Sequence, residues 1–179
     1  FAILGSRIFA SAFSDGIFFS TDKGLLWNRV AAGVWSRTVA ALASVPLQGG
    51  GTRLLAGTLG NGVLASDDTA RSWRSLDLGL VSNTAAGFSS MGSAVAAATD
   101  DGVLFSNDGG QNWSKPGKGL STSSISALAF LGPVLLAGST QQGMLLTSDR
   151  SATWVRNNDG LPKPEMSSLL VLGAKVYAG

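Results

Sequence analysis

The sequence predicts an all-β protein made of repeated, four-stranded antiparallel units. Two observations predict this fold class. First, a pattern that starts with glycine and ends with tryptophan occurs four times, at a spacing of about 40 residues, and self-similarity at such a period indicates a repeat architecture. Second, glycine accounts for 24 of the 179 residues, and helical periodicity is nowhere sustained. Many short strands joined by tight turns fit both observations.

Each unit contains four strand-like segments, taken here in chain order. The first is an apolar run, visible at 38–45, 85–89 and 126–131. The second begins upstream of the patterned glycine, at 7–10, 53–56, 93–96 and 134–137. The third strand and its following turn are the pattern itself, at 16–27, 62–73, 102–113 and 143–154. A short fourth segment, such as 27–30, follows each tryptophan.

Four short strands per unit at this period are the signature of a β-propeller blade. We therefore expect blades at 1–34, 35–80, 81–120 and 121–163, and the start of a fifth at 164–179. Residues 1–11 align with residues 169–179, so the chain begins and ends at the same point of the repeat. We expect it to be part of a larger propeller, completed by the rest of a longer chain or by self-association with a second copy.

The turns between the second and third strands carry a hairpin signal. Asp15-Gly16, Asn61-Gly62 and Asp101-Gly102 are dipeptides that favour two-residue type I′ turns. Gln142-Gly143 is a weaker version of the same signal in the fourth unit. The sequence therefore predicts four equivalent hairpins.

The pattern itself contains a recognisable motif, Ser-x-Asp-x-Gly-x-x-Trp. It is complete in the first and third units, as Ser20, Asp22, Gly24 and Trp27, and as Ser106, Asp108, Gly110 and Trp113. The second unit has Ser66, Asp68 and Trp73, with Ala70 at the glycine position. The fourth has Thr147, Asp149 and Trp154, with Ser151 at the glycine position. This motif resembles the Asp box, or BNR repeat, of sialidases, sortilin, xyloglucanases and photosystem II assembly factors.

The residue types of the motif suggest a structural role. An aspartate two positions after a strand can accept hydrogen bonds from the backbone amides of the next turn. Glycine supplies a positive φ, and tryptophan buries its ring while its indole N–H finds a carbonyl. The aspartates could instead be calcium ligands or catalytic acids. Repetition in every unit favours the structural role, as does the resemblance, in which the box lies opposite the usual active-site face.

Ligands of similar propellers meet the face built by the turns between the second and third strands and by the loops between blades. Asp15, Asn61, Asp101 and Gln142 would form a polar ring there, able to bind a sugar or a peptide. Alternatively they are only turn formers. Trp35 and Arg37, in the first loop between blades, are a further candidate binding pair, or Trp35 covers the inner edge of its blade.

Composition excludes several function classes. The formal net charge is +2, and its 13 Lys and Arg residues are scattered, which argues against nucleic acid as a partner. Cysteine and histidine are absent, so disulfides, thiolate or histidine metal sites and Ser-His-Asp catalysis are excluded. No cofactor or metal is expected. No run of about 18 apolar residues exists that could span a membrane.

The residue inventory favours a binding module over an enzyme. Sialidase chemistry needs a Tyr–Glu pair, and the lone Tyr177 and Glu165 lie in unsuitable positions. Asp15 and Asp101 could face each other as hydrolytic carboxylates, but tight hairpins would expose both to water. We therefore expect a non-catalytic scaffold that presents loops to a protein or glycan partner, with an extracytoplasmic or secreted location. The alternative is a fragment of an exported sialidase- or xyloglucanase-like glycoside hydrolase whose catalytic residues lie outside this segment.

Overall fold

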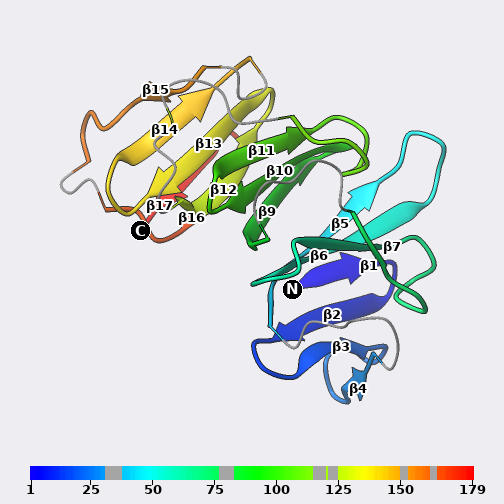
Figure 1. Ribbon diagram of the computed structural model, residues 1–179. Helices are drawn as coiled ribbons and strands as arrows, with labels where there is room; N and C mark the ends of the chain where they lie inside the picture. The colour runs from blue at the N-terminus through cyan, green and yellow to red at the C-terminus, as the bar shows by residue number, and fades with distance from the viewer. Residues whose placement is uncertain (31–37, 77–82, 115–119, 121–124, 150–152, 162–164) are drawn as a thin grey trace.

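The computed structural model describes residues 1–30, 38–76, 83–114, 120, 125–149, 153–161 and 165–179. Throughout these residues every regular element is a β-strand, so the all-β prediction is confirmed. The strands form successive antiparallel sheets that follow one another along an arc (Figure 1). In each sheet the strand order is the chain order, so every strand pairs only with its neighbours in sequence.

The first, second and fourth sheets have four strands each. The first contains β1 (Ala2–Leu4), β2 (Arg7–Ala12), β3 (Gly16–Ser20) and β4 (Asn28–Arg29). The second contains β5 (Val39–Pro46), β6 (Thr52–Thr58), β7 (Val63–Ser66) and β8 (Arg74–Ser75). The fourth contains β12 (Ile125–Leu131), β13 (Val134–Ser139), β14 (Gly143–Thr147) and β15 (Val155–Arg156).

The third and fifth sheets are smaller in the described part of the chain. The third contains β9 (Ala85–Met91), β10 (Ala94–Thr99) and β11 (Gly102–Ser106). Its fourth position is held by an isolated bridge between Phe105 and Ser114. The fifth is a hairpin of β16 (Leu169–Leu172) and β17 (Lys175–Ala178).

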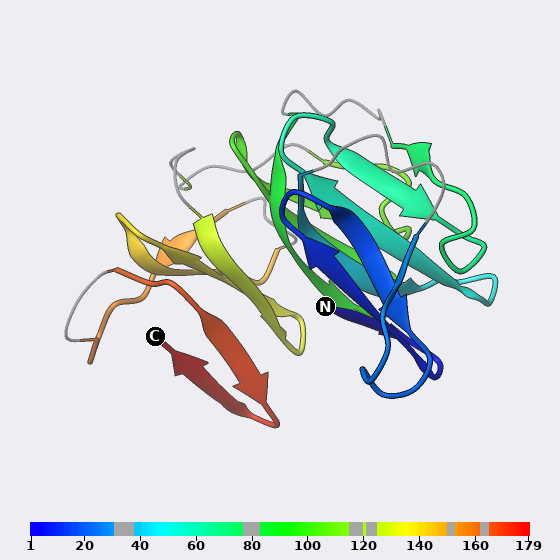
Figure 2. The ribbon, with the colours of Figure 1, turned by 90° about the horizontal axis from the view of Figure 1, so that it is seen from below.

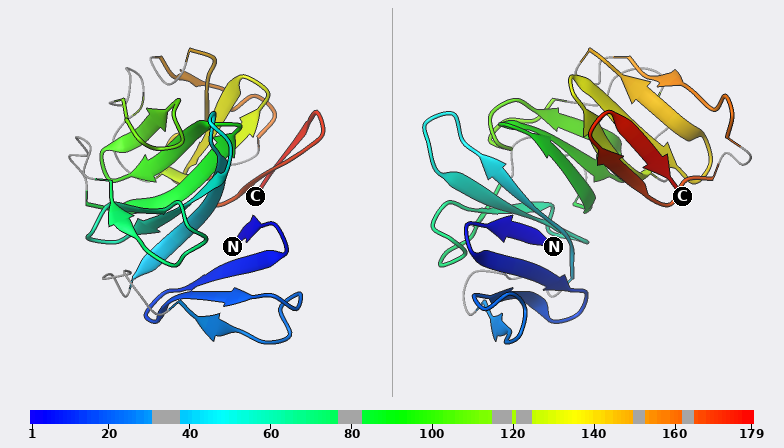
Figure 3. Two further views of the ribbon diagram at one scale, coloured as in Figure 1. Left: turned by 90° about the vertical axis from the view of Figure 1, so that its right-hand side faces the viewer. Right: turned by 180° about the vertical axis from the view of Figure 1, so that it is seen from behind.

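Packing between sheets runs through their first strands. Strand β1 contacts β5, β5 contacts β9, β9 contacts β12, and β12 contacts β16. The sheets therefore stand side by side with their first strands on the inner side of the arc (Figures 2 and 3). This is the relation that blades have in a propeller.

Apolar side chains fill the space between consecutive sheets. The first cluster joins Phe9 and Ile17 of the first sheet to Leu54, Leu64 and Trp73 of the second. Further clusters lie at the next three junctions, so each sheet is buried mainly by its neighbours. No element of the described residues is a helix long and apolar enough to cross a membrane.

The four motif tryptophans are not equally buried, which corrects our expectation. Trp73 and Trp154 are buried and Trp113 is half-buried, but Trp27 is 41% exposed. The reason is that Trp73, Trp113 and Trp154 pack against the sheet that precedes their own, as Trp73 packs with Phe9. Trp27 belongs to the first sheet, and its ring contact is a tilted one with Phe1, at 6.5 Å between centroids.

The hairpin turns also differ from the prediction. Type I′ needs a positive φ at both central residues. Asp15, Asn61 and Asp101 do not have one, whereas Gly16, Gly62 and Gly102 do, at 86°, 65° and 105°. Turns of the first, second and fourth sheets contain an extra residue before the left-handed glycine. In the second sheet Gly60 also has a positive φ, of 116°. The third sheet has a shorter turn, so Ala94, not Ser93, is equivalent to Arg7 and Arg53.

Turns gather on two opposite faces of the arc. On the first, which we call the entry face, the turns between second and third strands meet the segments that lead into the next sheet. There, Gly60 and Gly62 donate to the Asn83 carbonyl, at 2.8 and 2.7 Å, just before β9. On the second, which we call the aspartate-turn face, Gln48 donates to Ser93 at 3.3 Å across two sheets. The turns that follow β3, β7, β11 and β14 also lie on this face.

Candidate functional site

The aspartate-turn face carries the repeated motif, in what we call the serine–aspartate turns (20–27, 66–73, 106–113 and 147–154). In the first, Ser20 Oγ donates to Asp22 Oδ1 at 2.7 Å, and Asp22 Oδ1 accepts from the Leu26 amide at 2.9 Å. In the third, Asp108 Oδ1 accepts from the amides of Gln111 and Asn112, each at 2.9 Å. The carboxylates therefore hold the turn backbone.

The second and fourth turns have the same hydrogen bonds despite their departures from the motif. Ser66 donates to Asp68 at 2.8 Å, and Thr147 donates to Asp149 at 2.7 Å. The hydroxyls of Ser72 and Thr153 donate to the second oxygen of their aspartate. The added hydroxyl thus binds the carboxylate oxygen that the motif serine or threonine does not contact. In the third turn the Asn112 side-chain amide donates to Asp108 Oδ2 in the same way, at 2.6 Å.

Hydrogen bonding keeps these carboxyl groups ionised. The Ser72 hydroxyl, with the Ser72 amide, lowers the pKa of Asp68 to about 2. The Leu26 amide is the main cause of the lowered pKa of Asp22. Burial opposes ionisation of Asp108, but the amide and side chain of Asn112 still lower its pKa. A group this strongly committed to the ionised form is a poor general acid near neutral pH.

Sequence reasoning missed the second function of the motif serine. Its hydroxyl accepts from the amide four residues on: Gly24 donates to Ser20 at 2.8 Å, Ala70 to Ser66 at 2.9 Å and Gly110 to Ser106 at 2.9 Å. Serine therefore links the strand end to the left-handed part of the turn. The Ser-x-Asp-x-Gly spacing indicated this contact, because the glycine, four residues after the serine, is where the backbone reverses direction.

The expected indole hydrogen bonds are absent from the described residues. The Nε1–H groups of Trp73, Trp113 and Trp154 are buried and have no acceptor there. These rings lie in the apolar clusters between sheets, so hydrophobic contact determines their position.

On the entry face, hydroxyl groups brace the hairpin turns. Thr58 Oγ1 donates to the Gly62 carbonyl at 2.9 Å and accepts from the Asn61 amide at 3.0 Å. Thr99 makes the same pair of contacts with Gly102 and Asp101, at 2.9 and 3.2 Å. In the fourth sheet Ser139 accepts from the amides of Gln141 and Gln142, at 3.2 and 3.1 Å. The first sheet has Ala12 at this position and lacks the brace.

The residues of the predicted polar ring lie on the corresponding turn of the first four sheets, of which the third is one residue shorter. Asp15 and Asn61 are exposed, and Asp101 and Gln142 are half-buried. Trp35 and Arg37 lie outside the described residues. In the described part of the chain, no three acidic residues cluster in a way that could hold a metal ion.

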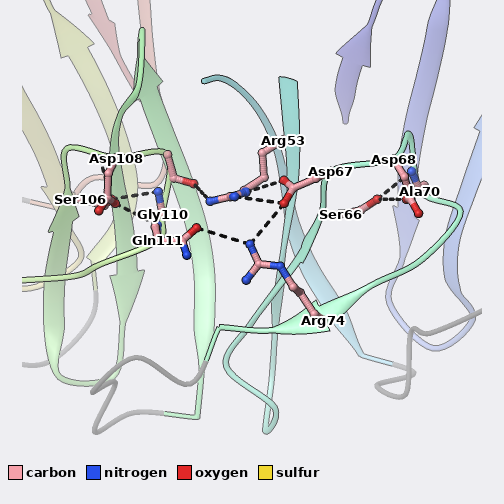
Figure 4. Close-up of polar contacts among 11 residues, drawn as sticks. Arg53, Ser66, Asp67, Asp68, Ala70, Arg74, Ser106, Asp108, Gly110 and Gln111 are labelled. Atoms are coloured by element: carbon pink, nitrogen blue, oxygen red, sulfur yellow. Dashed lines mark hydrogen bonds and ion pairs between the residues drawn. The ribbon is translucent and has the colours of Figure 1, made fainter. Parts of the chain in front are cut away.

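A buried arginine that sequence reasoning did not single out joins the second and third sheets (Figure 4). Arg53 is 5% exposed, and its Nε and Nη2 donate to the two carboxylate oxygens of Asp67, at 2.6 and 3.1 Å. Its Nη1 donates to the Gly109 carbonyl, in the next sheet, at 3.0 Å. Arg74 donates to Asp67 at 3.2 Å and to Gln111 at 3.5 Å. The hydrogen bond from Arg53 is the main cause of the lowered pKa of Asp67.

Comparison with known proteins identifies the fold. No protein-family model and no curated protein sequence matches the chain. Among solved structures, an ancestral GH74 enzyme matches 97% of this chain and 25% of its own length, at 19% identity and a TM-score of 0.77. The extracellular domain of a putative one component system from B. thetaiotaomicron matches 99% and 25%, at 14% identity and 0.75. The computationally designed Ika8 protein matches 99% and 53%, at 15% identity and 0.73.

The chain thus spans about half of the designed protein and a quarter of the other two. At these identities the likeness concerns the fold alone. The GH74 enzyme and the extracellular domain are β-propeller proteins, so the prediction of a propeller-type fold is confirmed at this level.

Proposed function

We propose that this chain is a non-catalytic β-propeller module that binds a protein or glycan partner through its entry face. The observation that carries the proposal is the repeated bracing of the entry-face turns by Thr58, Thr99 and Ser139. Each hydroxyl fixes a turn backbone, so the polar side chains of Asn61, Asp101 and Gln142 stand at equivalent positions. A preformed polar ring loses little conformational entropy when it binds a ligand.

The serine–aspartate turns fit the same proposal. We assign them as Asp boxes with an architectural role, in blades that correspond to 1–34, 35–80, 81–120 and 121–163, with a further blade beginning at 164–179. The hydrogen bonds that Asp22, Asp68 and Asp108 accept from turn amides support this role. The likeness to an extracellular domain and to secreted-type hydrolases favours a place outside the cytoplasm.

The second candidate is a segment of a glycoside hydrolase, favoured by the likeness to GH74 enzymes. In that case the catalytic residues would lie outside these 179 residues. Paired carboxylates elsewhere in a longer chain would favour this second candidate.

The test uses an array of plant and bacterial polysaccharides that includes xyloglucan, followed by a hydrolysis assay on each polysaccharide that binds. We expect binding without cleavage. The variants Asn61→Ala and Asp101→Ala should each weaken it by about tenfold, the factor that corresponds to roughly 1.4 kcal/mol. Gln48→Ala, on the opposite face, is the matched control. Cleavage would favour the hydrolase, and variants that bind as tightly as the wild type would refute the entry face as the site.

A further inference from the structure

The junction between the first and second sheets is a variant of the one that holds Arg53. Ile8 pairs with Ser20 as Leu54 pairs with Ser66, so Arg7 occupies the position of Arg53. In the second sheet the residue after the motif serine is Asp67, the carboxylate partner of Arg53. In the first sheet that residue is Thr21. The first junction therefore has the arginine and lacks the acid.

Arginine instead accumulates around a pocket at this first junction. The pocket has a volume of about 290 Å³ and is lined by Arg7, Phe19, Arg29, Val30, Thr69, Ala70 and Arg71. Three of the lining residues are thus arginines, and none is acidic. Arg7 stacks over the Phe19 ring at 5.5 Å, which holds its guanidinium against the pocket wall.

No acidic side chain of the described residues neutralises these arginines. Ion pairs within these residues are those of Asp67 with Arg53 and Arg74, in the second junction. The motif carboxylate next to Thr69 in the chain is that of Asp68. Its oxygens already accept from Ser66, from the amides of Arg71 and Ser72, and from the Ser72 hydroxyl. The pocket is therefore a concentration of positive charge in a protein whose formal net charge is only +2.

The backbone that lines the pocket is strained. Thr69 and Ala70 have φ values of 64° and 66°, in the left-handed region that β-branched residues rarely adopt. The equivalent residues of the third sheet are Gly109 and Gly110, which adopt this conformation at low cost. Residues held in such conformations concentrate at ligand sites. Here they place the exposed Arg71 at the rim of the pocket.

We propose that this pocket binds a carboxylate group supplied by an acidic side chain of a partner polypeptide. The second junction supplies the precedent, because there the protein places an aspartate between two arginines. A planar carboxylate suits the paired N–H groups of a guanidinium. The pocket volume of about 290 Å³ is enough to accommodate one acidic side chain. Phe19 and Val30 would contact its methylene stem.

This site lies on the aspartate-turn face and is separate from the binding function proposed for the entry face. The two can therefore fail independently. Loss of the acidic-peptide site would leave polysaccharide or protein binding at the entry face unchanged.

The test places a carboxylate of the protein itself beside the arginines of the pocket. Thr21→Asp installs the carboxylate that the second junction has, and Thr21→Asn is its uncharged, near-isosteric control. The probe is a blocked peptide of alternating glycine and glutamate, titrated into the 179-residue chain by calorimetry at low salt. We expect Thr21→Asp to weaken binding by about tenfold or more, since it removes the charge-assisted hydrogen bonds to the probe. Thr21→Asn should bind as the wild type does.

Arg71→Gln gives an independent measurement, because it copies Gln111 of the third sheet at an exposed position and should weaken the peptide similarly. Equal binding by wild type, Thr21→Asp and Arg71→Gln would overturn the proposal. So would equal losses in Thr21→Asp and Thr21→Asn, which would indicate a steric effect. Tighter binding of inorganic phosphate or of oligogalacturonate than of the peptide would overturn the assignment of the ligand as an acidic side chain.

Discussion

The junction between the first and second sheets and the junction between the second and third are built from the same repeat but are closed differently. The second junction uses Gly57 for close backbone approach, an internal Arg53–Asp67 pair and two glycines in the adjoining turn. At the same positions the first junction has Ser11, Arg7 beside Thr21, and the strained Thr69 and Ala70. In the second junction the buried arginine forms an ion pair with an aspartate, whereas at the first junction three arginines line a pocket that has no acidic residue. The difference shows how a repeat protein can turn a packing contact into a candidate site without changing its fold.

The largest effect should come from Gly57→Ala. A methyl group there would overlap the Ala85 carbonyl oxygen of the third sheet, which belongs to the backbone and cannot easily move. We expect a loss of about 3 kcal/mol in the free energy of unfolding, the upper part of the range for overpacking. Ser11→Ala, at the equivalent position of the first junction, should change it by less than about 0.5 kcal/mol. Urea unfolding of both variants measures the contrast, and equal losses would contradict it.

Breaking the internal ion pair should have the next largest effect. Asp67→Ala leaves the buried Arg53 without its carboxylate. Removal of one partner of a buried pair costs about 3–5 kcal/mol. Because the Asp67 side chain is 41% exposed, we expect less, about 2 kcal/mol by chemical denaturation. Thr21→Ala is the matched control and should change the free energy of unfolding by less than about 0.5 kcal/mol. Equal losses in Asp67→Ala and Thr21→Ala would contradict a special role for the ion pair.

Relief of backbone strain should give a smaller effect of opposite sign. Thr69→Gly removes the side chain from a left-handed residue and should raise the melting temperature, with a gain of about 0.5–1 kcal/mol. Gly109→Ala, the reverse change at the equivalent residue, should lower it, because its Cβ would also lie 2.6 Å from Leu47 Cδ2. A loss of stability in Thr69→Gly would show that the threonine side chain compensates for its strain.

The smallest effect should be the share of the pH dependence of stability that Asp67 contributes. The pKa of Asp67 is lowered in the folded protein, chiefly by the Arg53 hydrogen bond, so the folded state holds this proton less tightly than the unfolded one. The resulting stabilisation is complete above the unfolded value, near 4, and is lost as the pH falls through the folded value. The stability difference between wild type and Asp67→Asn should therefore be constant near pH 7 and shrink below about pH 4. A difference that stayed constant down to pH 2 would contradict this assignment.

Much of the fold follows from the sequence because its signals are local. The glycine-to-tryptophan pattern marks a strand, a turn and a tryptophan side chain at fixed spacing. Within each sheet, strands pair only with their neighbours in sequence. Turn details were less predictable, because Asp15-Gly16 is compatible with a two-residue or a three-residue loop. The burial of Trp27 depends on a preceding sheet, which no local pattern reports. The motif thus predicts where the tryptophan side chain lies in its own sheet but not how far other sheets bury it.

The arginine sites were harder to predict because they depend on two sheets at once. Arg7 and Arg53 stand at the same offset from their motif serine, and Asp67 follows Ser66 directly. Those offsets were visible in the sequence. Only the packing of one sheet on the next, however, brings Arg71 close to Arg7 and Gly109 close to Arg53. The polar ring that includes Asn61 and Asp101 was easier to propose, because residues at one repeat position can be aligned without knowledge of the partner sheet.

The purely sequential pairing of strands has a consequence for how the molecule opens. Each sheet is held by its own hairpins and by its immediate neighbours, so a sheet should open together with adjacent sheets more readily than with distant ones. Strand β6 is buried almost throughout, whereas all four residues of β17 are exposed. Amide protons of β6 should therefore exchange with solvent only when adjacent sheets open as well, whereas those of strands that other sheets do not cover exchange through local opening. Deuterium uptake should thus differ from strand to strand according to how far neighbouring sheets bury it.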